Sequence, residues 1–142
     1  MEQDIAVLVV DDEDRFRNNL VKLLRAENIK ALGARNAEEA FQALDCDCYD
    51  VVLLDVKMPG INGIEALKRI KRAGCDVEVI ILTGHASVDH AVEIMQYGAF
   101  DYLLKPCPME ELLDKVSLAV ERKREKRNTM GAKATRPDDK TT

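Results

Sequence analysis

The sequence lacks the features that mark nucleic-acid-binding, membrane and secreted proteins. Its 142 residues include 26 acidic and 21 basic side chains, a net charge of −5, whereas proteins that bind duplexes depend on surplus Lys and Arg. No apolar run approaches the roughly 20 residues that a membrane-spanning helix needs. The start, MEQDIAVLVVDD, has no basic segment before its apolar stretch. We therefore expect no direct nucleic-acid or membrane binding, no signal peptide and a cytoplasmic location.

Cysteine and histidine are also scarce. The four cysteines are Cys46, Cys48, Cys75 and Cys107, and no histidine lies near the C-x-C pair to complete a zinc site. A chain of this length with 46% hydrophobic residues can bury one compact core without disulfides. We therefore expect a single domain with reduced thiols.

Five short apolar segments alternate with segments of helical periodicity. The apolar segments, residues 5–10, 30–34, 51–54, 77–82 and 100–104, predict strands. Helices are expected at residues 13–28, 36–44, 64–74, 87–97 and from 108 onward. Asn36 with Glu39 forms a capping-box variant, Ser87 is a second N-cap, and Gly98 stands where a helix should end.

This alternation predicts an α/β fold with a parallel sheet and helices on both faces. Right-handed crossovers bring the carboxyl ends of all the strands to one edge, where ligands bind. The residues that follow strands one, three, four and five at this edge are Asp11 and Asp12, Asp55, Thr83 and Lys105. Three carboxylates, a hydroxyl and one ammonium are therefore expected in one cluster.

Three clustered carboxylates cannot all stay ionised beside a single lysine. Two of them about 4 Å apart repel by roughly 4 kcal/mol at an effective dielectric near 20. Either one carboxyl keeps its proton or a divalent cation joins, and oxygen ligands without His or Cys favour Mg²⁺. A carboxylate beside Mg²⁺ and Lys105 can attack a phosphoryl group, so Asp55 is the candidate nucleophile of an aspartyl phosphate. The Thr83 hydroxyl would bind a phosphoryl oxygen.

The segments VVDDE, LLDVKMPGINGIEAL, ILTGHA and YLLKP, in this order and at this spacing, resemble the receiver domain of bacterial two-component response regulators. The resemblance covers about residues 5–124 and implies a flavodoxin-like five-stranded sheet of order 2-1-3-4-5. It makes Asp55 the phosphoacceptor, Asp12 a direct Mg²⁺ ligand and Asp11 the residue that holds the water shell of the ion. The backbone carbonyl of Lys57 would complete the metal site.

The same resemblance implies the parts of a switch. Thr83 is the switch hydroxyl, Lys105 the phosphate-binding lysine and Tyr102 the switch aromatic. Lys57 and His85 occupy positions that influence how fast the phosphoryl group is lost. The implied partners are a sensor histidine kinase or phosphotransfer protein, an output partner or domain, and a second copy of the chain after phosphorylation. Within the family, the sequence looks closest to receivers of enhancer-binding transcription activators.

The end of the chain differs from the rest in composition. We expect the receiver at residues 4–126 and a disordered tail at residues 127–142, where apolar periodicity stops. The run ERKREKR at 121–127 is interpreted as a solvated helix end whose positive charge suits the helix dipole, with a partner-binding patch as the alternative. For single residues, Asp11 and Asp12 could instead cap the next helix, and Tyr102 could be a core aromatic.

Three other functions stay open at this point. An Mg²⁺-dependent phosphohydrolase with an aspartyl-phosphate intermediate would carry a second Asp two residues after the nucleophile, where Lys57 stands. A nucleotide- or flavin-binding module would need a Gly-rich first loop, where DDEDR stands. A receiver that is never phosphorylated would act only as an interaction module. The preferred interpretation is a signalling switch that catalyses its own phosphoryl transfer and loss without being a turnover enzyme.

Overall fold

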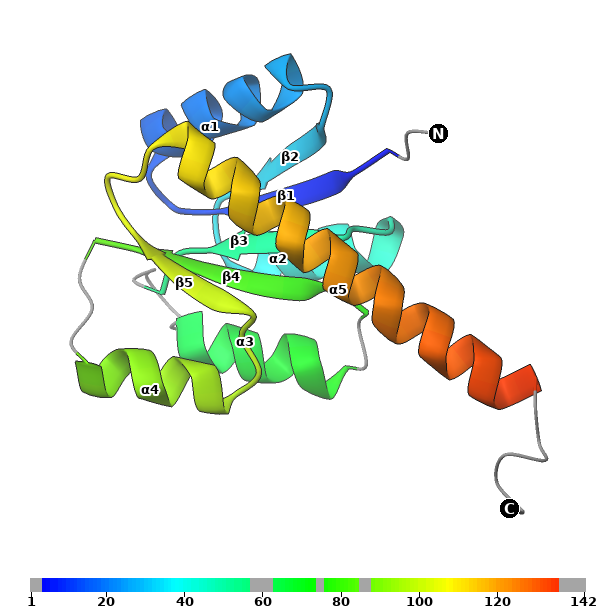
Figure 1. Ribbon diagram of the computed structural model, residues 1–142. Helices are drawn as coiled ribbons and strands as arrows, with labels where there is room; N and C mark the ends of the chain where they lie inside the picture. The colour runs from blue at the N-terminus through cyan, green and yellow to red at the C-terminus, as the bar shows by residue number, and fades with distance from the viewer. Residues whose placement is uncertain (1–3, 57–62, 74–75, 85–87, 136–142) are drawn as a thin grey trace.

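Five strands alternate with five helices along the chain (Figure 1). The computed structural model describes residues 4–56, 63–73, 76–84 and 88–135, and their side chains except at 88–91 and 127–135. The elements are β1 (Ala6–Val10), α1 (Asp14–Ala26), β2 (Lys30–Ala34), α2 (Ala37–Cys46), β3 (Val51–Leu54), α3 (Gly63–Arg72), β4 (Glu78–Thr83), α4 (Val88–Gln96), β5 (Asp101–Leu104) and α5 (Met109–Thr135). Except at the end of α5, the boundaries lie within two residues of those expected from the sequence.

The strands form one parallel sheet in the order β2-β1-β3-β4-β5, which confirms the expected strand order and fold class. In the register, Leu8 of β1 pairs with Leu32 of β2 on one side and with Val52 of β3 on the other. The order therefore changes direction between β1 and β3, and their carboxyl ends flank the point where ligands bind in such sheets.

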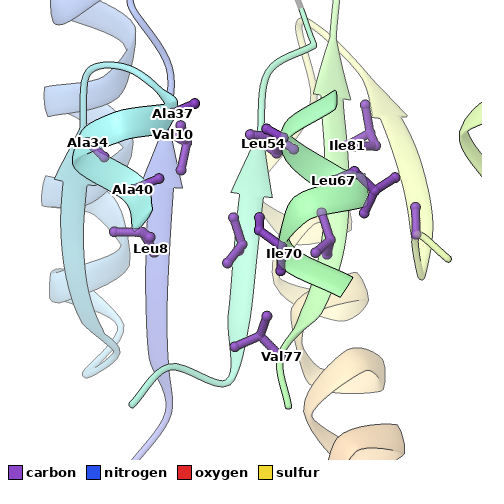
Figure 2. Packing of buried hydrophobic residues seen from close by; sticks show 14 of the residues in the cluster. Leu8, Val10, Ala34, Ala37, Ala40, Leu54, Leu67, Ile70, Val77 and Ile81 are labelled. Atoms are coloured by element: carbon purple, nitrogen blue, oxygen red, sulfur yellow. The ribbon is translucent and has the colours of Figure 1, made fainter. Parts of the chain in front are cut away.

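Helices cover the two faces of the sheet unequally, with α1 and α5 on one face and α2, α3 and α4 on the other (Figure 1). Alternate residues of each strand supply the two cores, as the pleat requires. Leu8, Val10, Leu54 and Ile81 pack with α2 and α3 residues, among them Leu67 (Figure 2). On the other face, neighbouring residues of the same strands pack against α1 and α5.

Local signals set the helix ends. The Asn36 side chain accepts a hydrogen bond from the Glu39 N–H at 2.9 Å, and a Glu39 oxygen accepts one from the Arg35 N–H at 2.8 Å. Gly98, just after α4, has φ 98°, a left-handed conformation that favours glycine. Ser87, the other expected cap, lies outside the described residues. No helix among the described residues combines the length and apolar character needed to cross a bilayer.

The last helix differs from the expectation. α5 runs for 27 residues to Thr135, through most of the segment expected to be disordered, and Figure 1 shows it continuing past the sheet. Extending an existing helix adds one hydrogen bond per residue and needs no apolar stripe, which explains why the loss of periodicity did not end it. Residues 121–127 are therefore not a helix end. Lys123 is buried and donates to Asp50, and Lys126 donates to Glu78, both at 3.1 Å.

Candidate functional site

Backbone hydrogen bonds hold three of the predicted site residues at the carboxyl edge of the sheet. The Asp11 N–H donates to the Ala34 carbonyl at 3.0 Å, and the Asp55 N–H donates to the Val10 carbonyl at 3.0 Å. The Lys105 N–H donates to the carbonyl of Thr83 at 2.8 Å. Each bond extends the parallel ladder by one residue beyond a strand, so the positions of these side chains are fixed by the sheet itself.

The three expected carboxylates lie together. Carboxylate oxygens of Asp11, Asp12 and Asp55 are all within 4.8 Å of one another. Asp11 and Asp55 are buried, with 2% and 8% of their surface exposed, whereas Asp12 is exposed. Because Asp12 faces solvent and the other two do not, it is the carboxylate best placed to meet an ion that arrives from water.

The Lys105 ammonium lies between two of these acids. Its Nζ donates to Asp11 Oδ2 at 2.7 Å and lies 3.8 Å from Asp55 Oδ2. The other oxygen of Asp11 accepts the Glu13 N–H at 2.9 Å. Asp11 is therefore engaged on both oxygens. The Lys105–Pro106 bond, at the turn out of β5, is cis.

Thr83 and Tyr102 come from neighbouring strands. Thr83 is the last residue of β4, is fully buried, and pairs in register with Leu104. Tyr102, paired with Ile81, is half-buried and packs against the cluster that β4 shares with α3 and α4. The core-aromatic and switch interpretations of Tyr102 therefore both fit its surroundings.

Lys57 and His85 lie outside the described residues, so their predicted roles stay predictions. The flanking Val56 and Gly63 are described, and the Gly63 N–H donates to the Val56 carbonyl at 3.0 Å. A Cβ on Gly63 would lie 2.2 Å from the Val56 Cα, a distance that no side chain tolerates. α3 can therefore begin this close to the end of β3 only with glycine at residue 63.

Sequence reasoning missed two residues that support the site. The Arg17 guanidinium donates to the backbone carbonyl of Asp11 at 2.9 Å and to Asp14 Oδ1 at 2.7 Å. The Phe16 ring lies under Lys105, with Nζ 4.2 Å from the ring centroid. Helical spacing predicts which face of the helix Phe16 occupies but not which cation lies over its ring.

Two groups in the segment that follows β5 have displaced pKa values. Burial, with a smaller contribution from Glu111, raises the pKa of the Cys107 thiol above its usual value. A hydrogen bond to Asp101 at 2.5 Å raises the pKa of Lys115. The three cysteines of the described residues, Cys46, Cys48 and Cys107, are free thiols, as expected.

The donor set suits a hard divalent cation. Three carboxylates contribute only oxygen atoms, from two strand ends and within the span of one ion. Mg²⁺ prefers such oxygens and retains several waters when it binds. The exposed side of Asp12 leaves room for those waters. The residues present therefore fit the ion that the sequence predicted.

Comparison with known proteins identifies the family. The response regulator receiver domain matches residues 7–117. The chain is 38% identical over 118 residues to the C4-dicarboxylate transport transcriptional regulatory protein DctD of Pseudomonas aeruginosa, covering 83% of this chain and 26% of that protein. It is 39% identical over 114 residues to the DNA-binding transcriptional regulator NtrC of Escherichia coli, covering 80% and 24%. The chain thus spans about a quarter of these relatives.

Solved structures agree with the sequence matches. A response regulator receiver domain protein from Clostridium thermocellum superposes with a TM-score of 0.78 at 36% identity, covering 84% of this chain and 97% of that one. The receiver domain of the Francisella response regulator 1452 gives a TM-score of 0.79 at 29% identity, covering 84% and 98%. The fold, the edge cluster and the matched residues agree, and this is a family of regulators rather than of metabolic enzymes. The chain therefore belongs to the response regulator receiver domain family, the phosphorylatable switches of two-component signalling.

Proposed function

We propose that Asp55 accepts a phosphoryl group from a phosphohistidine of a sensor histidine kinase or phosphotransfer protein. The observation that carries this proposal is the arrangement around Asp55. Oxygens of Asp11 and Asp12 lie within 4.8 Å of it, and the Lys105 ammonium lies 3.8 Å away. A nucleophilic carboxylate flanked by metal ligands and a cation is the arrangement that phosphoryl transfer requires.

The transfer step uses the chain's own residues for binding and charge. A carboxylate oxygen of Asp55 attacks phosphorus, an O–P bond forms, and the N–P bond to the donor imidazole breaks. The N–P bond electrons stay on the imidazole nitrogen, and because the other ring nitrogen carries a proton, the donor leaves as neutral histidine. Lys105 offsets negative charge on the transferring oxygens, and Thr83, at the end of the adjacent strand, donates its hydroxyl to one of them.

Asp11, Asp12, Asp55 and the backbone carbonyl of Lys57 would hold Mg²⁺ in this proposal. The ion supplies the positive charge that lets three carboxylates and a phosphoryl group share one site. Asp12, exposed, would be the direct ligand. Asp11, already bonded to Lys105 and to the Glu13 N–H, would hold the water shell. Lys57 and His85 would set how fast the phosphoryl group is lost.

The switch would act through Thr83, Lys105 and Tyr102. A hydrogen bond to a charged group contributes about 1.5–3 kcal/mol, whereas inverting a 1:99 population needs about 5.5 kcal/mol. Thr83 alone therefore falls short, and Lys105 is needed as well. The described parts of α4, β5 and α5 carry four exposed large apolar side chains: Val92, Met95, Leu104 and Leu118. The surface of these three elements would change on phosphorylation and bind an output partner or a second copy of the chain.

The receiver would comprise residues 4–126, with α5 continuing from it, and would act in the cytoplasm, where histidine kinases expose their phosphohistidine. The relatives DctD and NtrC are transcriptional regulators, so the output would be control of transcription through another domain or partner. The receiver would catalyse its own phosphorylation and dephosphorylation without turning over a separate substrate.

Incubation with acetyl phosphate and Mg²⁺ tests the proposal by intact-protein mass spectrometry. We expect a gain of one phosphoryl group that is lost in Asp55→Asn, because an amide cannot form the acyl phosphate. Asp76→Asn, an exposed aspartate at the opposite edge of the sheet, should retain the gain. No gain in the folded wild type would contradict the proposal and favour a receiver that acts only by interaction. Catalytic release of phosphate from a phosphomonoester would instead revive the phosphohydrolase.

A further inference from the structure

The aromatic ring beneath Lys105 stands out among the contacts of the site. Phe16, in the first turn of α1, lies with its ring centroid 4.2 Å from Lys105 Nζ. Lys105, directly after β5, and Phe16, in α1, are almost ninety residues apart in sequence and meet at the carboxyl edge of the sheet. At this distance the negative face of the ring attracts the ammonium.

The ring leaves the ammonium's hydrogen-bonding capacity intact. An ammonium has three N–H donors, of which one reaches Asp11 at 2.7 Å. Asp55 is 3.8 Å away, beyond a hydrogen bond but within reach of a small rotation. The attraction of a cation to a ring face depends only weakly on the direction of approach, whereas a hydrogen bond depends on it strongly. The ammonium can therefore move from Asp11 towards Asp55 without leaving the ring.

The surroundings make this attraction stronger than at an open surface. The Lys105 side chain is only 18% exposed and Asp11 only 3%. Phe16 is half-buried and packs against the cluster between the sheet and α1 and α5. Cation–π attraction increases as the cation loses water, so the ring and the two carboxylates together define where the ammonium can go.

We propose that Phe16 is a positioning residue for the phosphoryl chemistry at Asp55. It holds the Lys105 ammonium over the site, so that the ammonium transfers from Asp11 to the phosphoryl group on Asp55. This inference rests on the proposed function. The proposal requires an aromatic ring at residue 16, because only a π face attracts the ammonium. A purely structural role would require only a side chain of similar volume.

The test compares rings with aliphatic side chains of similar size. We expect Phe16→Leu and Phe16→Met to slow phosphorylation by acetyl phosphate about two- to fivefold, from the usual strength of a cation–π contact. Phe16→Tyr, which keeps the ring face, should restore the wild-type rate. The matched control is Phe41→Leu, because Phe41 is also half-buried and lies 4.5 Å beneath Arg69, away from the site. That variant should phosphorylate at the wild-type rate.

Two further readouts separate positioning from packing. In a double-mutant cycle, Phe16→Leu should have no additional effect in a Lys105→Met background, because the ring acts through the ammonium. By NMR, the Lys105 Hε protons should show an upfield ring-current shift that Phe16→Leu and Phe16→Met abolish and Phe16→Tyr retains.

The outcomes distinguish this inference from the proposed function. If the wild type gains a phosphoryl group at Asp55 but Phe16→Leu and Phe16→Met, both folded, react at the wild-type rate, the positioning role is wrong and the function stands. An equal loss in Phe16→Tyr and Phe16→Leu would also overturn it, since volume or packing would then be responsible. If the wild type is not phosphorylated at all, the proposed function fails first, and the ring-current shift still reports whether the contact exists.

Discussion

At the scale of single residues, the three aspartates are not equivalent. Asp11 accepts from Lys105 and from the Glu13 N–H, and Arg17 holds its backbone carbonyl. Asp12 is exposed, and Asp55 is buried with Lys105 nearby. In the proposed function, Asp11 organises the site, Asp12 meets the arriving ion and Asp55 is the nucleophile. The difference comes from neighbours, because the side chains are chemically identical.

The Cys107 thiol offers a prediction at this scale. Its raised pKa means a smaller thiolate fraction at pH 8, and only the thiolate is alkylated rapidly. We expect Cys107 to react with iodoacetamide more slowly than the exposed Cys46 and Cys48, with mass spectrometry of peptides as the measurement. Glu111→Gln should speed the reaction of Cys107 at pH 8, because a charge that disfavours the thiolate is removed, and its pH profile should move to lower pH. An unchanged profile would show that burial alone sets this pKa.

The sequence predicted which charged residues lie together better than it predicted the contacts that support them. The carboxyl ends of parallel strands share one edge, which predicts that Asp11, Asp12, Asp55 and Lys105 lie together, and the structure places them there. The contact of Phe16 with Lys105 depends on the rotation and distance of α1 relative to β5. Such geometry comes from packing between distant segments, and local patterns carry no information about it.

At the scale of elements, strand and helix boundaries followed from hydrophobic periodicity and caps. Asn36 with Glu39 started α2 as expected, because the bonds involved are local. α5 continues to Thr135, past the point where apolar periodicity stops, because extending a helix does not depend on an apolar stripe. Its anchors, such as Lys123 on Asp50, pair residues 73 positions apart in sequence. Patterns among neighbouring residues in the sequence cannot predict long-range ion pairs of this kind.

Glu78, at the start of β4, is the centre of the contacts that tie α3 and α5 to the sheet. It is buried, and three cations approach it: Lys126 at 3.1 Å, Arg122 at 3.8 Å and Lys71 at 3.9 Å. Burial lowers the pKa of Lys71, and Lys126 and Arg122 lower it further, while Glu78 opposes the shift. The carboxylate therefore offsets a repulsion among basic side chains from two helices.

Glu78→Gln should destabilise the fold by about 2 kcal/mol in urea unfolding at pH 7, less than a fully buried pair would cost because its cations are partly hydrated. The loss should shrink as pH rises towards the normal lysine range. A lowered folded-state pKa of Lys71 means that the unfolded chain binds more protons in that window, so stability rises with pH. Removing the Glu78 charge lowers the folded-state pKa of Lys71 further, so the pH range over which stability rises extends to lower pH.

The matched control for Glu78 is Glu65→Gln. Glu65 lies 4.0 Å from Arg72, with both side chains substantially exposed, so its removal should cost less than about 0.5 kcal/mol. Equal losses in the two variants, or a loss in Glu78→Gln that grows with pH, would contradict the role given to the buried carboxylate.

At the scale of the whole molecule, the two edges of the sheet differ in how their charges are arranged. The carboxyl edge gathers acids that need a cation, and the amino edge is closed by ion pairs of Glu78 and Asp50. Asp50 also accepts the Ala6 N–H at 2.9 Å, so β1, β3 and α5 are joined there. The ion pairs of the amino edge thus stabilise the fold at a distance from the site. The fold can therefore tolerate repulsion among the three carboxylates of the carboxyl edge when no ion is bound.

Thermal unfolding in Mg²⁺ and in EDTA tests this division. We expect Mg²⁺ to raise the Tm of the wild type, because an ion that binds only the folded state stabilises it by about 2.7 kcal/mol at a hundred times its Kd. Asp12→Asn should be slightly more stable than the wild type in EDTA and should lose most of the Mg²⁺ increment. Asp76→Asn should keep the increment. A wild-type Tm that does not respond to millimolar Mg²⁺ would argue against a metal site formed by these three carboxylates.

The length of α5 has a mechanical consequence. At about 1.5 Å per residue its 27 residues extend roughly 40 Å, about twice the span of the strands, so the helix acts as a stiff rod. Any polypeptide that continues from the rod takes its azimuth from the number of residues counted along it. One inserted residue would turn that polypeptide by about 100° around the rod axis, whereas an insertion of seven would nearly restore its original azimuth.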